Sequence, residues 1–166
     1  MDSNRNDAGS FRLLFVCTGN TCRSPMAEVI ARRRITELGW EYVEVRSAGV
    51  GAFDGSPASG GAVRAAEANG LDLSGHSATL LGHEEVEGSD LILAMSESHL
   101  RRIEELGGGD RATMITSFAD SGDEGAITRG VPDPIGGSDE EYVETLDLLD
   151  DLVVRALERI EPMLKP

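Results

Sequence analysis

The chain has 166 residues, which is enough for one domain with a hydrophobic core of its own. Its 30 acidic and 15 basic residues give a formal net charge of −15, with Lys165 as the only lysine. A surface of this sign repels nucleic acid and anionic membranes, so neither is expected as a partner.

The N-terminal residues and the cysteines narrow the class of protein further. Residues 1–10 are polar and contain no leader-like hydrophobic segment, so we expect a flexible tail followed by one domain over 11–166. No apolar run reaches the length of a transmembrane helix. Cys17 and Cys22 are the only cysteines, which excludes an extracellular disulfide framework. We therefore expect a cytoplasmic protein, and as its assembly a monomer or a weak dimer.

The first predicted elements are a buried strand over 11–16 and a helix over 25–38. Pro25 suits the first helical position, and Gly39 ends the helix. Its apolar positions recur at helical spacing and are Ala27, Ile30, Ala31, Ile35 and Leu38.

A short loop with a cysteine and an arginine joins these two elements. Five residues separate Cys17 from Arg23. Amides of such a loop can point inward and, with the helix N-terminus, bind a phosphate-sized anion. Arg23 would grip the same anion with a planar fork, and Cys17 would lie beneath it as a thiolate nucleophile. The predicted phosphate-binding residues are Thr18, Gly19, Asn20, Thr21, Cys22 and Ser24.

In the rest of the chain, predicted strands alternate with predicted helices. We expect strands over 42–46, 90–95 and 112–116. We expect one helix after an N-cap at Ser56, a second over 97–106, and a third that begins with a capping box of Ser138 and Glu141. A long mobile loop over 119–138 should precede the third helix. This order predicts an α/β fold with a parallel sheet covered by helices on both faces. Ligands of such sheets bind at the carboxyl ends of the strands, where Cys17 falls.

A phosphoryl-transfer nucleophile needs a proton donor for its leaving group, and Asp133 is the candidate. It lies between Pro132 and Pro134, which stiffen the backbone around it. As an acid it would protonate the departing oxygen or nitrogen, and as a base it would then activate water. The alternative is an ordinary turn aspartate.

Four segments together resemble the low-molecular-weight protein tyrosine phosphatases. They are Cys17–Glu28, Arg46–Gly49, Ser89–Met95 and Asp133–Gly137. The resemblance implies a single-domain three-layer sandwich with a four-stranded parallel sheet, and a phosphocysteine intermediate formed without metal or cofactor. It implies Arg23 as the phosphate clamp, Asp133 as the general acid, and phosphorylated proteins as substrates.

The resemblance also assigns supporting roles around the loop. Ser24 would hydrogen-bond the Cys17 thiolate. Asn20, Ser47 and His76 would hold the loop in shape.

The loop residue Thr21 bears on the substrate. Tyrosine-specific members of the family carry a bulkier residue there, whereas the threonine form resembles the bacterial protein-arginine phosphatases. Ile135 and Gly136 follow Asp133-Pro134 where tyrosine phosphatases place ring-stacking aromatics, although Phe53 offers one aromatic side. We predict a phosphoarginine phosphatase, with a phosphotyrosine phosphatase and a broad phosphatase as alternatives.

Two other function classes use a similar loop. An arsenate reductase would need relay cysteines that this chain lacks beyond Cys22, unless a small thiol served instead. A non-catalytic phosphate-binding module would lose the nucleophile, the clamp or the acid, and all three are present. His76, His83 and His99 make no metal-ligand spacing, so no metal is expected.

Cys22 has two interpretations. It packs beneath the loop, or it forms a reversible disulfide with Cys17 that shields the nucleophile from irreversible oxidation. The sequence does not decide between them.

Overall fold

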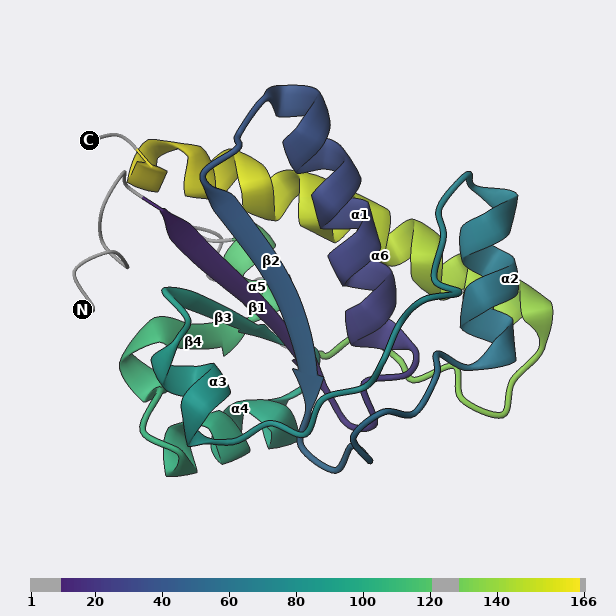
Figure 1. Cartoon of the computed structure of the whole chain (residues 1–166), viewed down its shortest axis with the longest axis horizontal. Coiled ribbons are helices and arrows are strands. Elements are labelled where there is room, and N and C mark those ends of the chain that lie inside the picture. Colours follow the sequence, from purple (N-terminus) through teal and green to yellow (C-terminus); the bar gives the residue numbers. More distant parts are fainter. Residues whose placement is uncertain (1–9, 121–128, 165–166) are drawn as a thin grey trace.

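The computed structural model describes residues 10–120 and 129–164. Within these ranges strands and helices alternate as predicted (Figure 1). The elements are β1 (Phe11–Cys17), α1 (Arg23–Leu38), β2 (Val43–Gly49), α2 (Gly60–Ala68), α3 (His83–Glu87), β3 (Leu91–Ala94), α4 (Glu97–Glu105), β4 (Ala112–Met114), α5 (Ile115–Ala119) and α6 (Asp139–Ile160), with short 3-10 turns at Gly109–Arg111 and Glu161–Leu164.

The four strands form one parallel sheet in the order β2-β1-β3-β4. Val16 of β1 pairs with Ala48 of β2 on one side and with Ala94 of β3 on the other. All carboxyl ends therefore meet at one edge of the sheet, and the loop that begins at Cys17 lies there. The predicted fold class, a four-stranded parallel sheet between helices, is confirmed.

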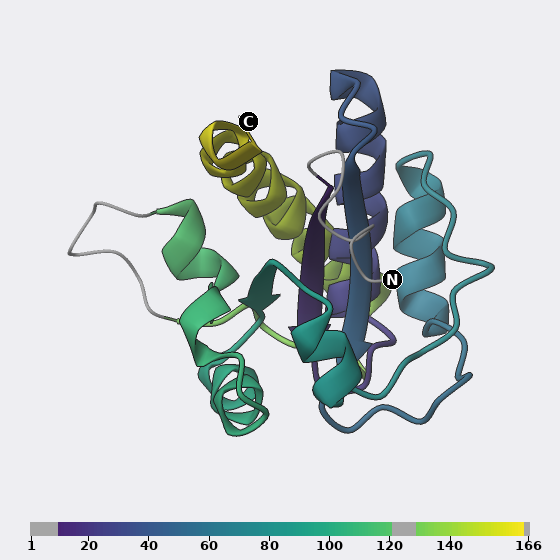
Figure 2. The ribbon, with the colours of Figure 1, turned by 60° about the vertical axis from the view of Figure 1, so that its left-hand side comes forward.

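Helices cover both faces of the sheet, which gives three layers (Figure 2). The larger core joins one face to α1, α2, α5 and α6. The smaller core joins the other face to α3 and α4. Side chains of β1 alternate between them, with Phe15 in the first core and Val16 in the second, both 0% exposed. This explains why β1 reads as a continuous apolar run.

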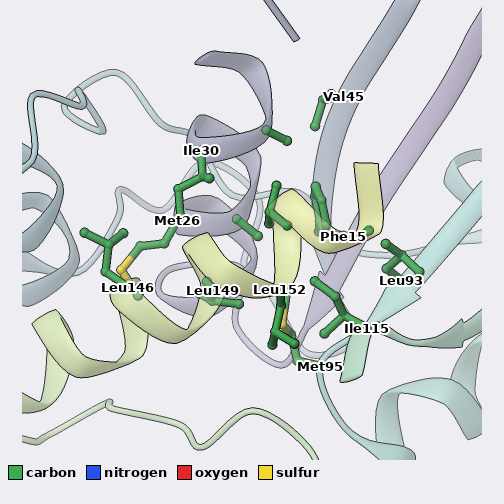
Figure 3. Close-up of a cluster of buried hydrophobic side chains, with 14 of the residues drawn as sticks. Phe15, Met26, Ile30, Val45, Leu93, Met95, Ile115, Leu146, Leu149 and Leu152 are labelled. Carbon is green, nitrogen blue, oxygen red and sulfur yellow. The ribbon is translucent and has the colours of Figure 1, made fainter. Parts of the chain in front are cut away.

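The larger core is filled by side chains from distant parts of the chain (Figure 3). Phe15 of β1 and Met26 of α1 pack in one cluster with Leu149 and Leu152 of α6. Burying each such side chain contributes about 1.5–3 kcal/mol relative to leaving it in water. This packing holds α1, and with it the loop that precedes α1, against the sheet.

Helix α1 differs from its prediction at its N-terminus, whereas its end at Leu38, followed by Gly39, is as predicted. It begins at Arg23, so Pro25 occupies the third helical position rather than the first. Proline is tolerated there because the N–H groups of the first turn have no acceptor within the helix. Leu38 was expected in the buried stripe but is 53% exposed, since the helix ends at Gly39 beyond the core.

The prediction of an N-cap at Ser56 is wrong, because α2 begins three residues later. Ser59 is the N-cap, and its hydroxyl accepts a hydrogen bond from the amide of Ala62. The ring of Tyr142 packs against Gly61 in the first turn of α2, which leaves no room for a side chain at position 61. A Cβ at this position would lie 2.3 Å from ring carbons of Tyr142.

The strand predicted over 112–116 ends at Met114, and its last two positions open α5 instead. Sequence periodicity cannot separate a short buried strand from a buried helical turn in so short an apolar run. Helix α3, over His83–Glu87, was not predicted.

The C-terminal half of the predicted organisation is largely confirmed. Ser138 and Glu141 form the expected capping box, in which the Ser138 amide donates to Glu141 Oε1 at 2.8 Å. The loop predicted over 119–138 falls partly on residues 121–128, which lie outside the described residues; α5 covers residue 119, and residues 129–138 form no helix or strand. Within the described ranges, none of the helices has the length and apolar character needed to span a bilayer.

Candidate active site

The loop from Cys17 to Arg23 connects β1 to α1 at the carboxyl edge of the sheet. Three contacts attach this loop to the end of β2 and to the residues that follow β2. Two are hydrogen bonds: the amide of Val50 donates to Cys17 O, and the amide of Gly51 donates to Thr18 O at 2.8 Å. The third is the close approach of Gly49, where a Cβ would lie 2.5 Å from Thr18 O. A larger residue at position 49 would push the loop away from the sheet.

The thiol of Cys17 is buried and has a hydroxyl partner. Its Sγ lies 2.9 Å from Ser24 Oγ, in the first turn of α1. Asn20 Nδ2 donates to the same Ser24 Oγ at 2.8 Å and to Ser47 Oγ at 2.9 Å. Because the Ser24 oxygen accepts a hydrogen bond from Asn20, the hydroxyl proton of Ser24 is free to be donated to a thiolate at Cys17.

Asn20 adopts a backbone conformation that shapes the loop. Its φ of 57° is left-handed, a region that asparagine tolerates better than most residues. Its carbonyl oxygen lies 2.7 Å from His76 Nε2, and its side-chain oxygen accepts from the Thr79 amide at 2.8 Å. Three groups of one buried residue thus fix the turn of the loop.

A carboxylate stands behind this network. Ser47 donates to Glu28 Oε1 at 2.5 Å, and Arg32 pairs with the other oxygen of Glu28. The chain of contacts runs from the surface at Arg32 to the buried Asn20. Glu28 was not among the predicted site residues, although it lies within the motif that begins at Cys17.

The guanidinium of Arg23 is buried beside the loop. Its Nη1 donates to Val131 O at 3.0 Å, and its Nη2 lies 3.4 Å from Thr18 Oγ1. Its Nε is buried and has no hydrogen-bond partner among the residues that the structure describes. A buried cationic group with an unused donor is suited to an anionic ligand.

Asp133, from the C-terminal half of the chain, lies beside the Arg23 guanidinium. Its Oδ2 lies 3.4 Å from Arg23 Nη2, and its Oδ1 accepts from the amide of Ile135 at 3.1 Å. The side chain is 42% exposed, so the carboxylate faces solvent on one side and the guanidinium on the other. The structure therefore brings Cys17, Arg23 and Asp133 into one site.

The thiol of Cys22 contacts hydroxyl groups outside the loop. Its Sγ is 3.1 Å from Ser59 Oγ and 3.5 Å from the hydroxyl of Tyr142. Burial, and then the contact with Cys22, raises the pKa of Tyr142. Both cysteines are free thiols. The hypothesis of a reversible disulfide with Cys17 stays a prediction.

Thr18, Gly19 and Thr21 complete the predicted loop. Thr18 is exposed, and its hydroxyl lies 2.8 Å from Nε2 of a buried histidine, His99. Thr21 is half-buried; its hydroxyl lies 3.8 Å from Cys22 Sγ, and its carbonyl accepts from the amide of Ser59.

Sequence reasoning considered His99 only as a metal ligand and missed its place beside the loop. Burial, and then the nearby Arg23, lowers its pKa to about 4, so it is neutral at ordinary pH. Across the described residues no group of three or more His, Cys, Asp or Glu side chains is arranged to hold a metal ion.

Comparison with known proteins identifies relatives along nearly the whole chain. The family model described as low molecular weight phosphotyrosine protein phosphatase matches residues 12–164. A protein-arginine-phosphatase of Geobacillus stearothermophilus is 36% identical over 153 residues, which is 91% of this chain and 97% of the relative. A low molecular weight protein-tyrosine-phosphatase of Streptomyces coelicolor is 34% identical over 148 residues, covering 85% and 88%.

The solved structures show the same architecture. One is a cysteine-to-serine mutant of the YwlE arginine phosphatase with a phosphorylated active-site serine, which superposes with a TM-score of 0.85. It is 33% identical in sequence, and the match covers 93% of this chain and 100% of that chain.

Proposed function

Since this chain belongs to the low molecular weight phosphotyrosine protein phosphatase family, we propose that it hydrolyses phosphorylated protein side chains through a phosphocysteine at Cys17, with phosphoarginine as the preferred substrate. The observation that carries the proposal is the position of Asp133. Its carboxylate lies 3.4 Å from Arg23, next to the loop that holds the thiol. A nucleophile, a cationic clamp and a candidate acid thus share one site, as phosphoryl transfer requires.

In the first step the Cys17 thiolate attacks phosphorus. A bond forms between sulfur and phosphorus, and the bond from phosphorus to the leaving nitrogen or oxygen breaks. Asp133 supplies a proton to the leaving atom, so that arginine or tyrosine departs neutral at that atom. Arg23 and the loop amides stabilise the charge on the phosphoryl oxygens, and Ser24 stabilises the thiolate through the contact at 2.9 Å.

In the second step water replaces sulfur. Asp133, now ionised, accepts a proton from the attacking water. The sulfur–phosphorus bond breaks, inorganic phosphate leaves, and Cys17 returns as the thiolate. No metal or other cofactor enters either step. The predicted roles of Thr18, Gly19, Asn20, Thr21 and Cys22 are to present the loop amides to the phosphate, while Ser47 and His76 hold the loop through Asn20.

The preference for phosphoarginine rests on the surroundings of the loop. Thr21 places a hydroxyl where apolar bulk would favour an aromatic ring, and a hydroxyl can accept a hydrogen bond from a guanidinium. The side chain after Asp133-Pro134 is Ile135, which is 58% exposed and provides no stacking surface. The relatives include both an arginine phosphatase and a tyrosine phosphatase, so they do not favour one substrate over the other. The proposed preference for phosphoarginine therefore rests on Thr21 and Ile135.

Phosphotyrosine is the second candidate, and Phe53 favours it. This aromatic ring is 81% exposed, two residues beyond Gly51, whose amide contacts the Thr18 carbonyl of the loop. A ring in that position offers one stacking face to a phosphotyrosine side chain.

The test compares phosphate release from matched peptides that carry phosphoarginine or phosphotyrosine. We expect a higher kcat/KM for phosphoarginine, and we expect Thr21→Ile to shift the ratio toward phosphotyrosine by roughly tenfold, the size of one lost hydrogen bond. Phe53→Leu is the matched control and should lower phosphotyrosine turnover alone. A wild-type preference for phosphotyrosine that Thr21→Ile leaves unchanged contradicts the proposed substrate.

A further inference from the structure

His99 is a buried polar residue with partners on both ring nitrogens. It is 1% exposed and lies in the first turn of α4. Nδ1 is 2.9 Å from the Ser96 hydroxyl, and Nε2 is 2.8 Å from the Thr18 hydroxyl. The register of the sheet brings His99 close to Thr18. Val16 of β1 is paired with Ala94 of β3, and the Met95 amide donates to Val16 O. The chains that leave these two strands therefore run side by side.

Thr18 stands between this imidazole and the Arg23 guanidinium. Within residues 10–120 and 129–164, Arg23 has one close contact, from Nη1 to Val131 O at 3.0 Å. Its Nη2 is placed by two weaker contacts, each at 3.4 Å, with Thr18 Oγ1 and Asp133 Oδ2. Asp133 must change its protonation state in the proposed reaction. Thr18 is thus the neighbour of Nη2 whose chemistry stays constant through the cycle.

The hydrogen bonds at Thr18 are compatible with a specific tautomer of His99. A guanidinium only donates, so the Thr18 oxygen accepts from Arg23. Its single proton is then available to His99 Nε2, and in the tautomer that accepts it the ring proton is on Nδ1, where it can be donated to Ser96 Oγ.

We propose that His99 is a positioning residue, which as a neutral imidazole accepts the Thr18 hydroxyl proton and keeps the Thr18 oxygen turned toward Arg23. The guanidinium plane is then set before the phosphate arrives, and this lowers the reorganisation needed in the transition state. Burial of the ring and the nearby Arg23 both act against an imidazolium, which could not accept from Thr18.

The kinetic part of the test rests on the proposed phosphatase activity and uses two matched pairs of variants, with 4-nitrophenyl phosphate as the probe. His99→Asn keeps a polar atom near the Nδ1 position, whereas His99→Gln extends one to the Nε2 position. Thr18→Val removes the hydroxyl at nearly constant volume, whereas Thr18→Ser retains it. Exposed His83, at the start of α3, gives the control His83→Gln.

We expect His99→Asn and Thr18→Val each to lower kcat roughly tenfold, with KM changed by less than about threefold, because the lost contact acts mainly on transition-state charge. The double variant should be no slower than either single one. His99→Gln and Thr18→Ser should recover most of the activity. Full kcat in His99→Asn, or losses that multiply in the double variant, would overturn the proposal.

A measurement on the wild-type protein tests the same hydrogen bond without activity. Nitrogen NMR of the imidazole should show His99 at neutral pH with its proton on Nδ1, the signal being assigned by its absence in His99→Gln. A proton on Nε2 would refute the proposed arrangement. If the wild-type chain hydrolyses no phosphorylated substrate, the proposed function fails, and the NMR result still decides the role of His99 at Thr18.

Discussion

At the scale of single residues, the site is built from buried polar groups that satisfy one another. Asn20, 0% exposed, makes four polar contacts that shape the loop, and Ser24 connects it to the Cys17 thiol. Removing one partner from such a network leaves the other buried without a hydrogen bond, which costs about 1–3 kcal/mol. The loop is therefore set in shape by its own side chains before a ligand binds.

The buried His99 predicts how stability depends on pH. Its pKa is lowered from 6.5 to about 4 in the folded protein, so between these values the unfolded chain binds more protons than the folded one. The free energy of unfolding should fall as the pH drops from 6.5 toward 4, by up to about 3 kcal/mol from this group.

Urea unfolding at pH 7 and pH 4.5 measures this effect in the wild type, His99→Gln and His83→Gln. Replacing His99 should reduce the loss of stability on acidification, whereas replacing the exposed His83 should not. An identical pH dependence in all three proteins would show that His99 does not carry the effect.

At the scale of elements, the junction of α2 with α6 supports the loop from behind. Ser59 caps α2, binds the Thr21 carbonyl through its amide, and contacts the Tyr142 hydroxyl of α6 at 3.2 Å. Gly61 lets the ring of Tyr142 lie close to the α2 backbone. One buried tyrosine thus links two helices to Cys22 of the loop.

A matched pair of glycine substitutions tests this junction. In Gly61→Ala the new methyl group would lie 2.3 Å from the Tyr142 ring, and we expect a loss of about 1–3 kcal/mol from overpacking. In Gly60→Ala the methyl group meets only the flexible Arg64 guanidinium, at 3.2 Å, so helix propensity should make it neutral or stabilising by up to about 1 kcal/mol. Equal stabilities of the two variants in urea unfolding would contradict the packing described.

At the scale of the whole molecule, a chain of net charge −15 would have to attract the proposed anionic substrate through the buried guanidinium of Arg23. The fold class, and the closeness of Arg23 to the loop that begins at Cys17, were predictable because their signals are local. Apolar runs and helical stripes mark the elements, and the cysteine and arginine lie within one short loop. Asp133 is singled out by its two flanking prolines and by the need for a proton donor, but its place 3.4 Å from Arg23 depends on a long-range contact that no local pattern reveals.

Other features depend on contacts that no local pattern reveals. Ser56 and Ser59 are both plausible N-caps, and the choice of Ser59 goes with its contacts to Thr21 and Tyr142. His99 looks like any helix residue until the register of β1 and β3 brings it to Thr18. Glu28 reads as a surface position of α1, although it is 8% exposed beneath Ser47.

The central claim is that phosphorus passes through the sulfur of Cys17, and one measurement tests it most directly. Asp133→Asn should slow the hydrolysis of the intermediate, because the base that activates water is lost. Peptide mapping by mass spectrometry, on this variant denatured during turnover of 4-nitrophenyl phosphate, whose leaving group departs without a proton from Asp133, should find phosphate on the peptide that contains Cys17, and none in a Cys17→Ala control. Continued turnover by Cys17→Ala, with no phosphate on that peptide in either protein, would contradict the account.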